Sequence, residues 1–135
     1  MPGTSPTAPH VLLVDDDAAV AKALAAVLVR AGYSVSVAGS AREAELLLDQ
    51  RFDALVLDLR MPEMRGDALY YLASARQPWL AERTLFVTGD ITEQAEEIIA
   101  QTGCELLHKP FRGDMLLQRV LRMAPLASRI VDRAC

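Results

Sequence analysis

Residues 11–17 read Val-Leu-Leu-Val-Asp-Asp-Asp, a short apolar run that ends in three acids. Residues 54–58 repeat the pattern as Ala-Leu-Val-Leu-Asp, and residues 85–88 read Leu-Phe-Val-Thr. Apolar runs of this length without polar alternation indicate strands that are buried on both faces. The three runs therefore predict the centre of a parallel sheet with helices on both sides.

The stretches between these runs have helical periodicity. Val20, Leu24, Val27 and Leu28 follow the spacing of a helix with one face in the core, and Gly32 is predicted to end that helix as its C′ residue. The same spacing returns in four later stretches, with predicted core positions Ala44, Leu47, Leu48, Leu69, Leu72, Ala73, Ala95, Ile98, Ile99, Thr102, Leu117, Val120, Leu121 and Ala124.

Two further strands are predicted at the edges of the sheet. Tyr33, Val35 and Val37 alternate with serines, which is typical of a strand with one wet face, and residues 104–107 form a short last strand. The whole pattern is (βα)5. Right-handed crossovers then favour a doubly wound five-stranded parallel sheet in the order 2-1-3-4-5, with a crevice at the carboxyl ends of the first and third strands.

The length of 135 residues corresponds to a single domain, at about 150 residues per domain. We expect a flexible tail over residues 1–9, the domain over residues 10–124 and a short extension over residues 125–135. With 52% hydrophobic and 24% charged residues, the chain can bury a core, which excludes disorder as its main state.

Charge and targeting signals limit which classes of partner and which location the chain can have. The net charge is −4 and the basic residues form no strip, so nucleic-acid binding by this chain is not expected. The longest aliphatic stretch, residues 23–29, is far below the ~20 residues of a membrane span, and the first residues lack the features of a secretory signal. Cys104 and Cys135 are too few for a disulfide framework. These features predict a cytoplasmic protein that does not insert into membranes.

The predicted crevice gathers acids. Asp15 and Asp16 follow the first strand and Asp58 ends the third, whereas Asp17 is expected to cap the first helix. Two carboxylates about 4 Å apart repel by roughly 4 kcal/mol at an effective dielectric near 20, which a proton or a cation must relieve. Oxygen ligands in a sparse set suit Mg²⁺.

A hydroxyl and an ammonium complete this edge of the sheet. Thr88 ends the fourth strand and Lys109 follows the fifth. Alone, each has an ordinary explanation as a strand residue or a solvated charge. Together with the carboxylates they are the groups that hold a transferring phosphoryl group.

The chain resembles the receiver domain of two-component response regulators, whose fold is flavodoxin-like. The resemblance covers residues 10–124 and rests on four motifs in order, which are VLLVDDD at 11–17, LVLDLRMPEMRG at 55–66, LFVTGD at 85–90 and LLHKPF at 106–111. It implies a phosphoacceptor signalling domain with intrinsic self-phosphorylation and dephosphorylation rather than an enzyme. The phosphoryl donor would be a phosphohistidine on a histidine kinase or a histidine phosphotransfer protein.

The resemblance also implies roles for residues at the metal and the acceptor. Asp58 would accept the phosphoryl group. Asp16, Asp58 and the backbone carbonyl of Arg60 would ligate Mg²⁺ (or Mn²⁺), and Asp15 would act through a bound water. Lys109 would pair with Asp58 before the reaction and with a phosphoryl oxygen afterwards.

Further roles concern the conformational response. Thr88 would swing toward the phosphate, the N–H of Gly89 would bind it, and Pro110 resembles the family's cis peptide. Many receivers have an aromatic residue three positions before the lysine, but this chain has Leu106, which offers no ring and no hydroxyl.

Positions that tune phosphate lifetime in the family hold Arg60 and Asp90, which we hypothesise to pair across the site as a lid. His10 and His108 are expected to have ordinary surface roles, and His108 is expected to face away from Lys109.

Other interpretations stay open on the sequence alone. A phosphatase of the haloacid dehalogenase type would use Asp15 as its nucleophile, although Ala19 stands where that motif has Thr or Val. A receiver-like interaction domain that is never phosphorylated is another possibility. A flavin-binding flavodoxin is disfavoured because three acids would repel the phosphate. The receiver could act alone or belong to a hybrid histidine kinase, and could dimerise through its fourth and fifth helices, as family members do.

Overall fold

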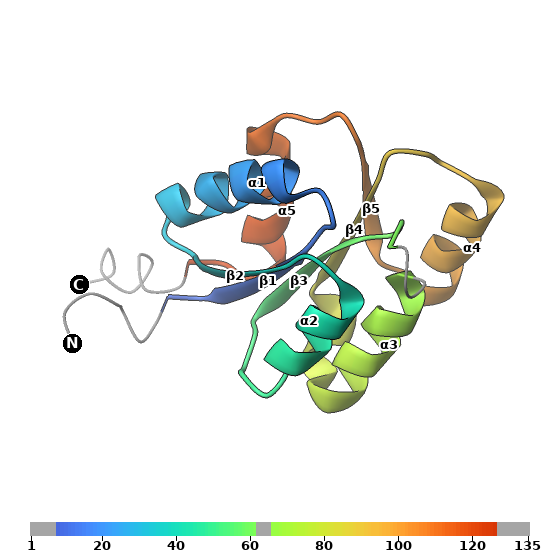
Figure 1. Cartoon of the computed structure of the whole chain (residues 1–135), viewed down its shortest axis with the longest axis horizontal. Helices are drawn as coiled ribbons and strands as arrows, with labels where there is room; N and C mark the ends of the chain where they lie inside the picture. Colours follow the sequence, from blue (N-terminus) through green and yellow to red (C-terminus); the bar gives the residue numbers. More distant parts are fainter. Residues whose placement is uncertain (1–7, 62–65, 127–135) are drawn as a thin grey trace.

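The computed structural model describes residues 8–61 and 66–126, and it places five parallel strands in one sheet (Figure 1). The strand order is β2-β1-β3-β4-β5, as the sequence predicts. Short apolar runs form the three central strands, because only such sequences can be covered on both faces. The strands are β1 (His10–Val14), β2 (Ser34–Ala38), β3 (Ala54–Asp58), β4 (Thr84–Thr88) and β5 (Glu105–His108).

Helices cover both faces of the sheet (Figure 1). On one face lie α1 (Ala18–Ala31) and α5 (Gly113–Met123), and on the other lie α2 (Ala41–Leu47), α3 (Gly66–Arg76) and α4 (Glu93–Thr102). A 3-10 helix, η1 (Pro78–Glu82), precedes β4 and was not predicted from the periodicity.

Local signals set the helix ends. Asp17 caps α1 and Thr92 caps α4, and each side chain accepts backbone N–H bonds of the first turn. Gly32 and Gly103 end these two helices in the left-handed conformation, with φ of 118° and 73°. The capping role of Asp17 and the C-terminal position of Gly32 therefore agree with the sequence analysis.

The core has two parts, one on each face of the sheet. The side chains of β3 and β4 are buried throughout, and those of β1 are buried except that of His10, which is partly buried. Val37 is 45% exposed, so the expectation that it joins the apolar face of its strand is wrong. An edge strand is covered less completely than a central one, and its residues tolerate exposure. On α5 the fully buried residues are Leu116 and Val120, and the predicted Leu117 is only partly buried.

Two contacts fix α1 and β2 against α5. A Cβ atom added at Gly113 would lie 2.8 Å from Cγ2 of Val27, so the two helices approach closely at this point. The hydroxyl of Tyr33, just before β2, donates a hydrogen bond of 2.6 Å to the carbonyl of Ala124, just after α5. Both contacts are local constraints that bring the ends of distant elements together.

The predicted tail and extension lie mostly outside the described residues, as does Cys135. Leu126, two residues after the expected end of the domain, is buried and joins the core beneath α1 and α5. Cys104 is a buried free thiol. Within the described ranges, the helices are too short or too polar to cross a bilayer.

Candidate functional site

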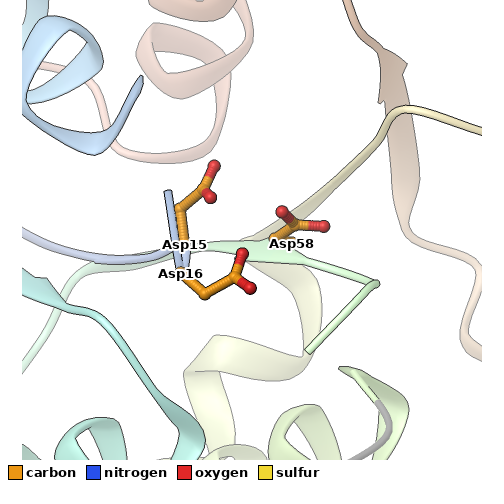
Figure 2. Close-up of side chains that lie close together, drawn as sticks. All are labelled: Asp15, Asp16 and Asp58. Atoms are coloured by element: carbon orange, nitrogen blue, oxygen red, sulfur yellow. The ribbon is translucent and has the colours of Figure 1, made fainter. Parts of the chain in front are cut away.

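The site lies where β1 and β3 end side by side (Figure 2). Val14 pairs with Leu57 in the parallel register, so Asp15 follows next to Asp58. Asp15 and Asp58 are almost fully buried, whereas Asp16 is exposed. Oxygen atoms of the three carboxylates lie within 4.8 Å of one another. The sequence prediction that these acids converge is therefore correct.

Lys109 reaches this cluster from the end of β5. Its Nζ donates to Oδ2 of Asp15 at 2.9 Å and to Oδ2 of Asp58 at 3.1 Å. Burial lowers the pKa of the Lys109 ammonium, but the two hydrogen bonds more than offset this effect and leave the pKa raised. The contact with Asp15 was not anticipated. The peptide between Lys109 and Pro110 is cis, as the resemblance implies.

The remaining oxygens of the two buried carboxylates accept backbone N–H bonds. Oδ1 of Asp58 accepts from the N–H of Arg60, and Oδ1 of Asp15 accepts from the N–H of Asp17, both at 2.9 Å. Burial raises the pKa of the Asp58 carboxyl, and the bonds from Arg60 and Lys109 offset this only in part. Asp58 is thus held at both oxygens in a setting that disfavours its charge.

The donor set fits a hard divalent cation. Asp15, Asp16 and Asp58 offer carboxylate oxygens at one open cleft of about 310 Å³, which Arg60, Gly89 and Lys109 also line. Oxygen ligands from few residues, with room for water, suit Mg²⁺ and also Mn²⁺. Asp17 lines the same cleft but its Oδ1 accepts the N–H groups of Ala19 and Val20 as the cap of α1, so it does not belong to the donor set.

The loop after β4 borders the cleft. The hydroxyl of Thr88 donates to the carbonyl of Asp90 at 3.0 Å and accepts from the N–H of Asp90 at 3.3 Å. The guanidinium of Arg60 forms an ion pair with the carboxylate of Asp90, so the two side chains of the hypothesised lid are in contact. Both side chains are more than half exposed.

Leu106 and His108 lie on the same strand, β5, but differ in their surroundings. Leu106 is partly buried and packs on the core beneath α2, α3 and α4. His108 is exposed, but its Nε2 lies 3.1 Å from the carbonyl oxygen of Gly89, a contact that the sequence analysis missed. The sequence signal for this contact was the histidine directly before Lys109. His10 lies at the opposite end of the sheet and contacts Ser36.

Comparisons with known proteins agree on one family. Residues 11–121 match the response regulator receiver domain. The chain is 38% identical over 116 residues to the C4-dicarboxylate transport transcriptional regulatory protein DctD of Rhizobium meliloti, which covers 85% of this chain and 25% of the relative. The chain thus spans about a quarter of the length of this curated relative.

Solved structures give the same result. The chemotaxis protein CheY4 of Vibrio cholerae matches with a TM-score of 0.76 and 28% identity, over 86% of this chain and 98% of that one. A response regulator from Burkholderia pseudomallei matches with a TM-score of 0.74 and 26% identity, over 94% of this chain and 73% of that one. The Burkholderia structure contains a phosphorylated aspartic acid, a calcium ion and citrate.

Proposed function

The chain belongs to the response regulator receiver domain family, and on that premise we propose that Asp58 accepts the phosphoryl group in two-component signalling. The observation that carries this assignment is the position of Asp58 at the end of β3, with Lys109 on one oxygen and the N–H of Arg60 on the other. These contacts orient the carboxylate toward an open cleft. Positioning of this kind is most of what phosphoryl transfer requires of a protein.

In the proposed reaction, an oxygen of Asp58 attacks the phosphorus of a phosphohistidine on a histidine kinase or a histidine phosphotransfer protein. A P–O bond forms, the P–N bond breaks, and its electron pair remains on the imidazole nitrogen. Lys109 is close enough to Asp58 to neutralise the phosphoryl oxygens as charge develops. We propose that a small donor such as acetyl phosphate serves in the same way, with its P–O bond broken and acetate as the leaving group, and that the domain is a self-phosphorylating acceptor rather than an enzyme with a separate substrate.

The metal ligands that we propose for Mg²⁺ or Mn²⁺ are Asp16, Asp58 and the backbone carbonyl of Arg60, with Asp15 acting through water. When bound, the cation neutralises the carboxylates and orients the phosphoryl oxygens. The cluster of carboxylate oxygens within 4.8 Å supports this set. The structure of the Burkholderia relative contains both a phosphorylated aspartic acid and a calcium ion, which supports it further.

The proposed response begins at Thr88. Its hydroxyl leaves Asp90 and binds a phosphoryl oxygen, and the N–H of Gly89 binds the phosphate as well. Contacts that exist only in this second arrangement shift the population of the domain toward it. Leu106 packs in the core near this strand and would fill space that Thr88 vacates, without exposing a ring or a hydroxyl.

The partners and setting follow from the same assignment. We propose a cytoplasmic phosphorelay in which this domain receives phosphate and does not itself bind nucleic acid. The output module and the stand-alone or hybrid-kinase context belong to the proposal as open alternatives, since the chain spans a quarter of its relative DctD. Dimerisation through α4 and α5 is tested by light scattering with and without beryllofluoride.

The deciding experiment measures the intact mass after incubation with Mg²⁺ and acetyl phosphate. We expect a gain of one phosphoryl group in the wild type that requires Mg²⁺ and is absent from Asp58→Asn. Asp49→Asn is a matched control, because Asp49 is exposed and precedes β3 at the opposite edge of the sheet.

A wild type that gains no mass with acetyl phosphate or with a phosphorylated histidine donor would refute the proposal in favour of an interaction domain without phosphorylation. Labelling lost in Asp15→Asn but kept in Asp58→Asn would instead select the dehalogenase-type phosphatase. Nothing in the fold or in the comparisons favours that phosphatase.

A further inference from the structure

The peptide unit between Gly89 and Asp90 is held at both of its ends by side chains. Its carbonyl oxygen, which belongs to Gly89, lies 3.1 Å from Nε2 of His108. Its N–H, which belongs to Asp90, donates to the hydroxyl of Thr88 at 3.3 Å. The two side chains come from neighbouring strands, β5 and β4, whose last residues Thr88 and His108 are register partners.

The hydrogen bond fixes the role of the histidine. A carbonyl oxygen can only accept, so Nε2 of His108 carries the proton and donates. The ring therefore fastens the loop to β5, which is anchored to β4 by its backbone pairing. Among the described residues, the hydrogen bond of the His108 side chain goes to the loop, whereas those of the Lys109 side chain go to Asp15 and Asp58. An effect of the His108 side chain through this bond therefore acts on the loop.

We call the hydrogen bonds of Thr88 and His108 with this peptide unit its two clamps, and phosphorylation is expected to affect them differently. The hydroxyl of Thr88 now bonds only to Asp90 within the loop, and it is the group that we expect to turn toward the phosphoryl oxygens. Once it turns, the N–H of Asp90 loses its acceptor, and the loop is then held by the clamp from His108 on the carbonyl and by the ion pair of Arg60 with the Asp90 side chain. This clamp then opposes any reorientation of the loop that brings the N–H of Gly89 to the phosphate.

The loop has room to move. A second cleft, of about 210 Å³, adjoins the loop, and it is lined by Leu59, Arg60, Thr88, Asp90, Thr92, Gln94, Ala95 and Ile98. Gly89 is exposed, and a Cβ atom placed there would have no neighbour within 4 Å. Packing therefore restrains the segment weakly, which leaves its position to the few polar contacts that it makes.

We propose that His108 is a positioning residue that holds the loop after β4 in its unphosphorylated arrangement and so restrains the response of the domain to phosphate. The inference rests on the proposed function, because it assumes that Thr88 and Gly89 engage the phosphoryl group. It assigns to this histidine a regulatory part in addition to the acceptor chemistry of the aspartates and the lysine.

The test compares His108→Val, which removes the donor but suits a strand, with His108→Gln, whose amide can donate to the same carbonyl. An exposed hydrogen bond of this kind biases the equilibrium by about threefold. Since affinity for a state scales with its population, His108→Val should bind beryllofluoride with Mg²⁺ about threefold more tightly by calorimetry. His108→Gln should return to the wild-type value. His10→Val, the same change at the far end of the sheet, should leave the affinity unchanged.

A second measurement needs no ligand. Amide hydrogen exchange at Asp90, followed by NMR, should be about threefold faster in His108→Val and restored in His108→Gln. Equal or weaker beryllofluoride binding by His108→Val, or no rescue by Gln, overturns the inference. If the wild type fails to bind beryllofluoride, the proposed function fails, and unchanged exchange at Asp90 then separately overturns the role of His108.

Discussion

Replacing Lys109 with Met tests whether the Lys109 ammonium stabilises the acidic cluster. The variant keeps the length and much of the apolar volume of the side chain but removes the ammonium that bonds to both Asp15 and Asp58. Two carboxylates within 4.8 Å repel by about 3 kcal/mol at an effective dielectric near 20. Breaking a buried ion pair costs about 3–5 kcal/mol, and the 24% exposure of the Lys109 side chain reduces this.

We therefore expect Lys109→Met to lower the free energy of unfolding by about 2–4 kcal/mol at pH 7 without Mg²⁺. Urea denaturation followed by circular dichroism measures this difference. Saturating Mg²⁺ should stabilise the variant more than the wild type, because the cation then meets carboxylates that nothing else neutralises. The deficit should shrink at acidic pH, as the raised pKa of Asp58 lets that carboxyl take up a proton.

A double variant, Lys109→Met with Asp58→Asn, supplies the control. Removing one carboxylate together with the cation should recover most of the lost stability. A loss below about 1 kcal/mol in the single variant, or a double variant no more stable than the single one, would refute the reasoning that charge repulsion in the cluster governs its stability.

Three further predictions follow from the described contacts. Burial raises the pKa of Asp58, so the stability that this carboxyl contributes is present below its unfolded pKa and is lost as pH rises through its folded pKa. Without Mg²⁺, Asp58→Asn should therefore be more stable than the wild type at pH 7, and a series of urea denaturations should show the gain vanishing below about pH 4. Equal stability of the two proteins at pH 7 would contradict this prediction. Arg60→Ala should speed the loss of phosphate by at most about fivefold, since an exposed ion pair is worth at most about 1 kcal/mol, and Asp90→Ala should have the same effect. If a phosphate-release assay finds an unchanged lifetime, the lid hypothesis is wrong. Tyr33→Phe should lower the free energy of unfolding by about 1–2 kcal/mol, because it leaves the carbonyl of Ala124 without the hydroxyl that donates to it. Chemical denaturation measures this loss, and a value near zero would mean that water replaces the hydroxyl.

The sequence was sufficient for the sheet and for the placing of the acids. Central strands without alternation and helices with regular spacing are local patterns, and their order restricts the topology. Since parallel strands end at one edge, the residues that follow β1 and β3 had to be neighbours. Asp17 could be separated from the metal-ligand candidates because capping is also a local property.

The contacts that depend on side-chain reach could not be derived in this way. Lys109 touches Asp15 as well as Asp58 only because β5 and β1, which have two strands between them, end at the same cleft. The contact from His108 to Gly89 depends on the path of a loop whose residues have no regular spacing. The 3-10 helix η1 was missed because five residues are too few for a periodic signal.

The close approach of α1 and α5 at Gly113 has a consequence for how this sequence can change over evolution. Val27 is β-branched and has little rotamer freedom on a helix, so it cannot turn away from a methyl group at position 113. A mutation from glycine to alanine at that position would be rejected as long as Val27 remains, yet it would be accepted in a lineage that had first acquired alanine at position 27. The two positions form an epistatic pair, in which the order of the substitutions decides whether α5 can gain helical propensity at position 113.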